Sequence, residues 1–265
     1  MNETVTPDAK RRGGRRERRD LRTRPDHAML PTLAGQLPLT EPMDQEQIER
    51  IDAASLDILE EVGVVFRDDI ALEDWRKAGA DVRGERVHLD RGLVKSLIKT
   101  IPSEITLHAR NPEKTVALGG RQSIFIPMTG APYLRDLEDV RRSPTLDDLA
   151  TFHKLAHMLP AMHSSAHHIV EPMDHPISHR HLRITHSSML YSDKTFMGMT
   201  TSGQNAEDVL DMCAILFGEE YLETHAVVTG NCNGNSPLVW DETMLSAMRA
   251  FNRRNQPVLC SPFVL

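Results

Sequence analysis

Polar side chains, nearly all uncharged, follow four of the strands predicted in the second half of the chain. They belong to Tyr133, Glu171, Thr200, Ser202, Asn231, Asn233 and Ser236. In parallel α/β folds the C-terminal ends of the strands share one face, where the loops are free to vary. Hydroxyls, amides and a single carboxylate suit a small cation or zwitterion, whereas a phosphate would call for Arg or Lys. The pattern therefore predicts substrate-binding residues, and it identifies no catalytic residue.

The same residue types also have structural uses. Asn and Ser form turns and cap helices, so Asn231, Asn233 and Ser236 could be turn formers and the N-cap of the next helix. Glu171 could instead form a structural hydrogen bond or an ion pair with a neighbouring loop. Sequence alone leaves both uses open.

Histidine is the other conspicuous residue type, because nine of the thirteen histidines fall between His153 and His186. His153 and His157 are spaced to share one face of a predicted helix, and His167 and His168 adjoin a strand end. A metal-dependent hydrolase or lyase is therefore an alternative hypothesis. The spacings match no zinc pattern, so we predict no metal site and expect most of these side chains to be exposed or hydrogen-bonded.

Several catalytic and cofactor motifs are absent from the sequence. There is no HExxH, GxSxG, GxGxxG or GxxxxGK[ST] segment. Cys213, Cys232 and Cys260 form no CxxC pair and are odd in number, which disfavours disulfides and cysteine-bound zinc. Buried reduced thiols are the expected state.

The elements that must position these residues alternate between strand and helix after Gly119 and Gly120. Strands are predicted at 123–127, 165–170, 195–200, 226–229 and 257–261, with helices at 146–158, 178–191, 205–217 and 241–253. This βα alternation without a phosphate-binding fingerprint favours a (β/α)8 TIM barrel. Because a barrel takes about 250 residues and about 145 follow Gly120, we expect residues 119–265 to be its first part, truncated after about five strands.

Residues 44–118 are predicted to form an α+β lead-in. Its expected elements are a helix from Asp44 to Gly63, a helix at 69–78, a hairpin through Gly84 and a helix at 91–100.

Residues 1–43 are predicted to be a basic disordered arm followed by a proline-rich segment. Residues 10–24 carry nine Lys or Arg and two acids, a net charge of +7, so the remainder of a chain of net charge −7 carries −14. The arm has no aromatic residue to stack on a base, which favours docking on an acidic protein surface over nucleic acid. A non-enzymatic binding module that uses this arm is a further alternative.

The chain shows no apolar run long enough to span a bilayer and no secretory signal. We therefore expect a cytoplasmic protein with no membrane segment. The sequence does not fix the oligomeric state, and a homo-oligomer is compatible with it.

Nearly the whole chain resembles the trimethylamine methyltransferase family, motif by motif and in the same order. The segments that carry the resemblance are "LPLTEPMDQEQIERIDAASLDILEEVGVVF", "PSEITLHARNPEKTVALGG", "TLDDLATFHKLAHMLP", "EPMD", "LYSDKTFM", "NSPLVWDETML" and "QPVLCSPF". The Arg-rich head is also similar to that of the family.

The resemblance implies a TIM-barrel enzyme that moves a methyl group from a methylated amine to the cob(I)alamin of a partner corrinoid protein, with no cofactor bound directly. Most family members lack pyrrolysine, whose position would lie beyond Leu265, and use quaternary amines. The resemblance thus favours a quaternary amine such as glycine betaine over trimethylamine. It makes Tyr133 and Glu171 the candidates for meeting the ammonium charge, and Asn231, Asn233 and Ser236 the candidates for a betaine carboxylate.

Overall fold

The first helix of the predicted lead-in begins where its capping residues indicate. The computed structural model describes residues 28–35, 38, 40–235 and 237–261, so the basic arm lies outside the described residues. Asp44 and Gln47 form a reciprocal capping box at the start of α2 (Gln45–Asp57). The helix continues as a π-helical turn, Ile58–Val62, and ends at Gly63, whose φ of 74° favours glycine.

The other predicted helices and the hairpin of the lead-in are confirmed. The elements that follow are β2 (Val64–Arg67), α3 (Asp69–Lys77), β3 (Asp81–Arg83), β4 (Arg86–His88), α4 (Arg91–Ile98), β5 (Glu104–Leu107), a 3-10 turn (Pro112–Lys114) and β6 (Val116–Gly119). The β3–β4 hairpin turns through Gly84 at a φ of 61°, and β5 pairs with β6. The four-stranded sheet has the order β12-β2-β4-β3, so a strand from far along the chain, β12 (Val239–Asp241), joins it.

Five parallel segments lie side by side in chain order. β10 (Phe196–Met197), β11 (Val228–Cys232) and β13 (Val258–Cys260) form one parallel sheet in that order. Single parallel bridges extend the order backwards, from Thr195 to Ser164 and from Val170 to Ala131. The predicted parallel order is confirmed in part, as a mixed α/β array, and no closed barrel is found among the described residues.

Two predicted strands are wrong in their details. The strand predicted at 123–127 is replaced by β7 (Gln122–Ser123), which pairs antiparallel with β1 (Leu33–Ala34). The strand predicted at 165–170 survives only as its two bridges, because Ala166 has a φ of 55° and interrupts the extended backbone. A short unpredicted hairpin, β8 (Leu134–Arg135) with β9 (Arg141–Arg142), follows the first segment.

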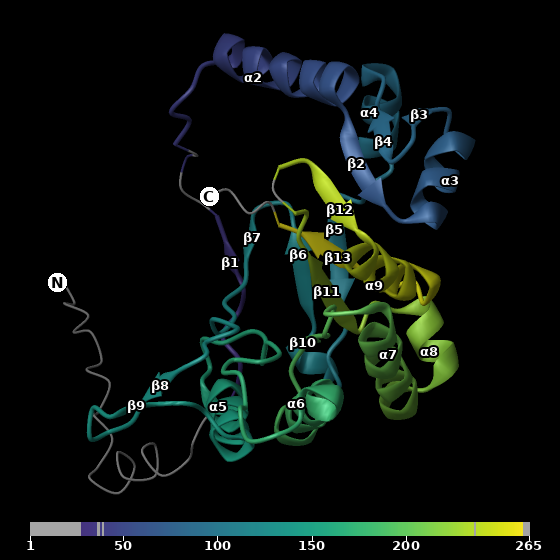
Figure 1. The fold of residues 1–265 in the computed structure, drawn as a ribbon. Coiled ribbons are helices and arrows are strands. Elements are labelled where there is room, and N and C mark those ends of the chain that lie inside the picture. Colours follow the sequence, from purple (N-terminus) through teal and green to yellow (C-terminus); the bar gives the residue numbers. More distant parts are fainter. Residues whose placement is uncertain (1–27, 36–37, 39, 236, 262–265) are drawn as a thin grey trace, which may run out of the picture.

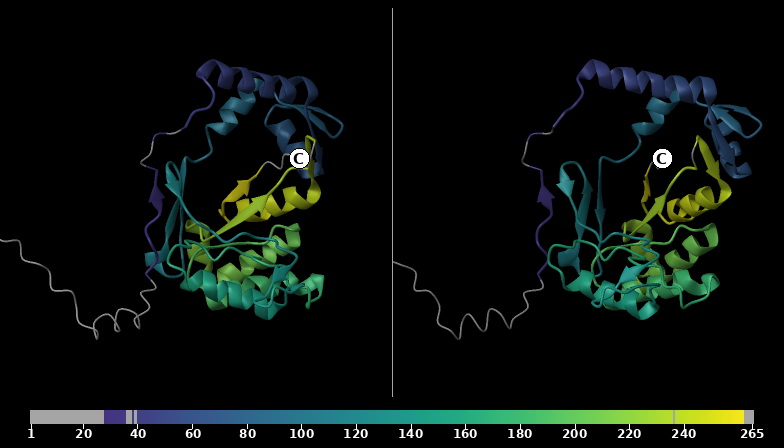
Figure 2. Two further views of the ribbon diagram at one scale, coloured as in Figure 1. Left: turned by 90° about the vertical axis from the view of Figure 1, so that its left-hand side faces the viewer. Right: turned by 60° about the vertical axis from the view of Figure 1, so that its left-hand side comes forward.

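Helices pack beside this array close to their predicted positions. They are α5 (Leu146–Met158), α6 (Ile177–Tyr191), α7 (Gly203–Phe217), the unpredicted α8 (Glu219–Thr224) and α9 (Glu242–Arg253). Figures 1 and 2 show α2 at one end of the molecule and α5 at the other, with β11 and α9 between them.

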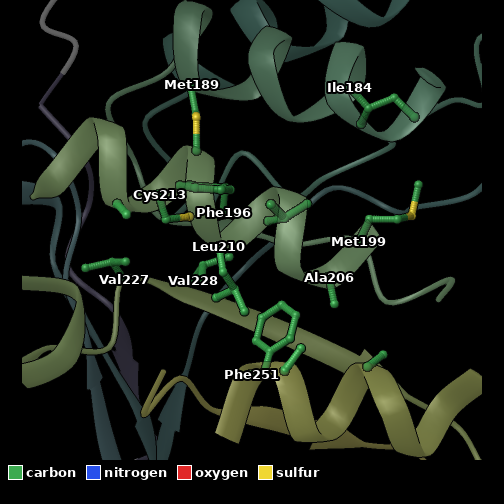
Figure 3. Packing of buried hydrophobic residues seen from close by; sticks show 14 of the residues in the cluster. Ile184, Met189, Phe196, Met199, Ala206, Leu210, Cys213, Val227, Val228 and Phe251 are labelled. Carbon is green, nitrogen blue, oxygen red and sulfur yellow. The ribbon is translucent and has the colours of Figure 1, made fainter. Parts of the chain in front are cut away.

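The main core lies between the parallel array and helices α6, α7 and α9. Its fully buried side chains include Phe251, Leu210 and Val228, and the Phe251 ring points from α9 toward the other two (Figure 3). A Cβ on Gly198 would lie 2.9 Å from both Phe251 Cζ and Val209 Cγ1, so this contact requires glycine. A second, smaller core around Val87 and Phe66 packs within the lead-in sheet.

An ion pair joins the two cores across 181 residues of sequence. Arg249 on α9 donates to both carboxylate oxygens of Asp68, at 2.8 and 2.6 Å, and Asp68 also caps α3 by accepting from the N–H of Ala71. The Asp68 side chain is only 3% exposed. Burial alone would raise the pKa of this carboxyl, but the bonds from Arg249 and Ala71 outweigh it and hold the pKa below its usual value.

We therefore expect Arg249→Met to lower the free energy of unfolding by about 3 kcal/mol, because it leaves a buried carboxylate without its partner. Urea denaturation followed by circular dichroism measures the change. Arg253→Met is the matched control, since Arg253 on the same helix makes only an exposed contact at 3.8 Å with Glu207. Equal losses in the two variants would contradict a linking role for Arg249.

Candidate functional site

The ends of β10 and β11 bring together two residues that the sequence predicts at the site. Thr200 is 8% exposed, and its hydroxyl donates to the backbone oxygen of Asn231 at 2.5 Å. Asn231 lies within β11 rather than in the loop after it, because this strand runs further than predicted. The hydroxyl bond therefore ties two neighbouring parallel segments at the end where a ligand would meet them.

A third segment joins them through Ser261, which sequence reasoning missed. The Ser261 hydroxyl donates to Asn231 Oδ1 at 3.3 Å. With its amide nitrogen facing the backbone oxygens, Asn233 donates to Ser261 O at 2.8 Å and to Cys232 O at 3.3 Å. Asn231, Asn233, Ser261 and Thr200 thus form one polar cluster, called the amide cluster below. Ser261 could have been found from the sequence, since it ends the last predicted strand.

Two other predicted site residues have a different outcome. Ser202 is the N-cap of α7, with its hydroxyl accepting from the N–H of Asn205 at 3.1 Å. Ser236 lies outside the described residues. The alternative in which this asparagine loop supplies the N-cap of the next helix is not observed, because Asp241 caps α9 by accepting from the N–H of Met244 at 2.9 Å.

The two residues proposed to meet an ammonium charge are both engaged with arginine. The Arg141 guanidinium lies over the Tyr133 ring, 4.0 Å from its centroid, and Glu171 accepts from Arg180 at 2.8 Å. Glu171 also donates its backbone N–H to Ala131 O, so it sits beside the first segment of the array. Glu171 therefore forms the ion pair that the alternative described, although its partner lies on helix α6 and not on a loop. One face of Tyr133 already carries a cation.

His153 on α5 and His167 in the second segment are buried, and both are hydrogen-bonded, which agrees with the expectation that most of these histidines are exposed or hydrogen-bonded. His153 is fully buried, with Nε2 2.7 Å from the backbone oxygen of His167 and Nδ1 2.9 Å from the Ser187 hydroxyl. A carbonyl oxygen can only accept, so Nε2 carries the proton and Nδ1 accepts. Burial lowers the pKa of His153 to about 4, which makes it a neutral side chain near pH 7.

The adjacent pair His167 and His168 is neutral for the same reason. Their Nδ1 atoms lie 2.9 Å apart, and burial lowers the pKa of each ring. Within the part of the chain that the structure describes, no group of three or more His, Cys, Asp or Glu side chains could hold a metal ion. The metal-dependent alternative thus finds no support among these residues.

The cysteines are all free thiols, but they are not all buried as predicted. Cys213 and Cys232 are buried, and burial raises the pKa of Cys232 to about 11, whereas Cys260 is exposed. Among the described residues, no helix is both long and apolar enough to cross a membrane.

Comparison with known proteins decides the family. The family model described as trimethylamine methyltransferase (MTTB) matches residues 11–265, which includes most of the basic arm. The chain belongs to this family.

This chain is similar to three named methyltransferases. The chain is 40% identical over 230 residues to a glycine betaine methyltransferase of Desulfitobacterium hafniense strain Y51, which covers 86% of this chain and 48% of the relative. It is 26% identical to the trimethylamine methyltransferase MttB of D. hafniense strain DSM 10664 / DCB-2, over 73% of this chain and 40% of the relative. It is 27% identical to a proline betaine:corrinoid methyltransferase of Eubacterium limosum, over 80% and 45% of the two chains. The chain thus spans about half the length of the curated relatives it matches.

The hydroxyl bond inside the amide cluster is open to a direct test. We expect Thr200→Val to cost about 1–3 kcal/mol of folding free energy, because it leaves the backbone oxygen of Asn231 without its donor. Thermal denaturation measures the loss. Thr243→Val, an exposed threonine at the start of α9, is the control, and a loss no larger than the control's would show that the bond does not hold these segments together.

Burial of neutral His153 predicts a pH-dependent stability. The pKa of His153 is about 4 in the folded chain, below the ordinary 6.5. Between these two pH values the unfolded chain binds a proton at His153 and the folded chain does not. The contribution of neutral His153 to the free energy of unfolding is fully present above pH 6.5 and falls by about 3 kcal/mol as the pH drops to 4.

We expect His153→Gln to flatten the dependence of unfolding free energy on pH between 7 and 4. His179→Gln is the control, since His179 is an exposed residue of α6. Urea titrations at a series of pH values measure the slope, and an unchanged slope in His153→Gln would contradict the assignment.

Proposed function

We propose that this protein transfers a methyl group from a quaternary amine, glycine betaine in the first instance, to the cob(I)alamin of a partner corrinoid protein. The observation that carries the proposal is the 40% identity to a glycine betaine methyltransferase, sustained over 86% of the chain. The proline betaine:corrinoid methyltransferase among its relatives supports both the betaine class and the corrinoid acceptor.

The parallel segments support a TIM barrel as the scaffold. Five segments follow one another in chain order, and the three regular strands are separated by helices, as in a (β/α)8 unit. Active sites in that fold form at the C-terminal ends of the strands, the place where the amide cluster lies. A division at residue 118 between lead-in and barrel, as the sequence predicts, remains part of this proposal.

The chemistry of a quaternary amine fits the neutral character of these strand ends. The electron pair of the broken C–N bond stays on nitrogen, so the amine leaves as a neutral tertiary amine and needs no proton. The buried histidines beside the array are neutral near pH 7, which agrees with a site that orients its substrate rather than protonates it. The corrinoid supplies the nucleophile as a co-substrate, and we assign none of the described residues to hold it.

The amide cluster is proposed to bind the carboxylate of the betaine. The Asn231 side-chain oxygen accepts from Ser261, which orients its amide nitrogen as a donor for a carboxylate. Thr200 fixes the backbone of Asn231 from the neighbouring strand. Asn233 and Ser202 supply further polar groups near the same strand ends, and Tyr133 and Glu171 flank the first segment. Ser236, which lies outside the described residues, is included from its place in the sequence alone.

The function is tested by incubating the protein as its gene encodes it with a corrinoid protein in the cob(I)alamin state and glycine betaine. Transfer is followed by the absorbance change on methylation of the cofactor and by formation of dimethylglycine. Trimethylamine and proline betaine are tested in parallel. Absence of turnover with every methylated amine would overturn the proposal.

The carboxylate role predicts a selective kinetic effect. Asn231→Ala should raise the KM for glycine betaine about tenfold, the value of one hydrogen bond to a charged group, while kcat changes less. Inhibition by tetramethylammonium, which has no carboxylate, should be unchanged. Asn205→Ala on α7 is the matched control, and an equal loss of affinity for both ligands would contradict the assignment to the carboxylate.

A further inference from the structure

Both tryptophans of the chain line the same cavity, away from the amide cluster. The cavity holds about 350 Å³ between α3 and α9, and its walls include Phe66, Trp75 and Trp240. This is a concentration of aromatic rings in a protein with only 5% aromatic residues. Its volume lies in the range of small-molecule sites.

The parallel pairing of β2 with β12 (Val239–Asp241) assembles these rings. Trp240 lies directly opposite Phe66 in that register, although 174 positions separate them. Trp75, from α3, tilts toward Phe66 with ring centroids 5.5 Å apart and an interplanar angle of 56°. Figure 1 shows β2 beside β12, with α3 and α9 next to them. Three separate elements therefore turn aromatic surface toward one space.

The charges around the cavity leave it with acidic character. Its lining contains two charged residues, Asp74 and Arg249. Arg249 is committed to the buried carboxylate of Asp68 by two hydrogen bonds, so that pair contributes no net charge. Asp74 is exposed and has Lys77 only at 3.9 Å, a distance and exposure at which the attraction is weak.

We propose that this aromatic cavity binds the quaternary ammonium group of a small amine, at a site separate from the strand ends. Aromatic faces attract a cation that cannot donate hydrogen bonds, and a nearby carboxylate adds to the attraction. Tyr133, the aromatic residue expected to play this part, already has a guanidinium over its ring. The cavity thus offers what the array does not, three aromatic walls and a carboxylate in one place.

The composition of the chain provides the assay, because its tryptophan fluorescence comes only from Trp75 and Trp240. Choline is the probe, since it carries the ammonium group without the carboxylate that the amide cluster is proposed to bind. Its neutral carbon isostere, 3,3-dimethylbutan-1-ol, has the same shape and no charge. We expect a saturable fluorescence change with choline and a response at least tenfold weaker with the alcohol.

Variants locate the site independently of catalysis. Asp74→Asn should weaken choline binding about threefold to tenfold without removing any ring, whereas Glu73→Gln, an exposed neighbour on α3, should leave it unchanged. Trp240→Leu should abolish binding measured by calorimetry, with circular dichroism to confirm that the variant folds. If Trp240→Leu does not fold, the Asp74→Asn comparison still decides.

Three outcomes would overturn the proposal. The first is no binding of choline, and the second is equal binding of choline and the alcohol, which would show a merely apolar cavity. The third is a signal that depends on protein concentration in place of ligand, which would show that a second copy of the chain occupies the cavity. None of these outcomes bears on methyl transfer, so failure here and failure of the proposed function are distinguishable.

Discussion

The ion pair between Arg249 and Asp68 joins the two apolar cores of this structure across 181 residues of sequence. Helix α9 is apolar toward the parallel array, through Ala247, Ala250 and Phe251, and meets the lead-in sheet with its opposite side. On that side Arg249 reaches a carboxylate that also caps α3. Because the Asp68 carboxylate is buried, separating the lead-in sheet from α9 would leave this charge without its partner. Arg249 also lines the aromatic cavity, so the ion pair fixes one side of that cavity.

Polar residues at the strand ends also hold the fold together, as Asp68 and Arg249 do. Thr200 and Asn231 hold adjacent parallel segments together, and Ser202 begins a helix. A ligand that binds there meets groups already fixed in position, so little conformational entropy is lost on binding. Asn231 itself has a structural role, since its side-chain oxygen accepts from Ser261 and its backbone oxygen accepts from Thr200.

Local signals account for the parts of the fold that the sequence predicts. Capping residues such as Asp44, Thr145 and Asp241 start helices because their side chains satisfy backbone donors within three residues, and glycines at 63 and 84 turn the chain at positive φ. The pairing of β2 with β12 has no such local signal, since it depends on two short segments meeting after 174 residues. The positive φ of Ala166 is even harder to predict from the sequence, because alanine rarely adopts a left-handed backbone conformation.

Only part of the candidate site could be predicted from the sequence, because some of its contacts join elements that have no local signal. Thr200, Asn231 and Asn233 could be predicted because strand ends are recognisable from the alternation of strands and helices. Ser261 and the arginines that contact Tyr133 and Glu171 were not predicted. Arg141 belongs to an unpredicted hairpin and Arg180 to the first turn of a helix. A betaine has two unlike ends, a carboxylate that needs donors and an ammonium that accepts none. The hydrogen-bond donors lie at the ends of the parallel strands, whereas Phe66, Trp75 and Trp240 line the cavity between α3 and α9. Only 5% of the residues in this chain are aromatic. The gathering of three aromatic side chains in one cavity is therefore the feature that bears most on where an ammonium group would bind.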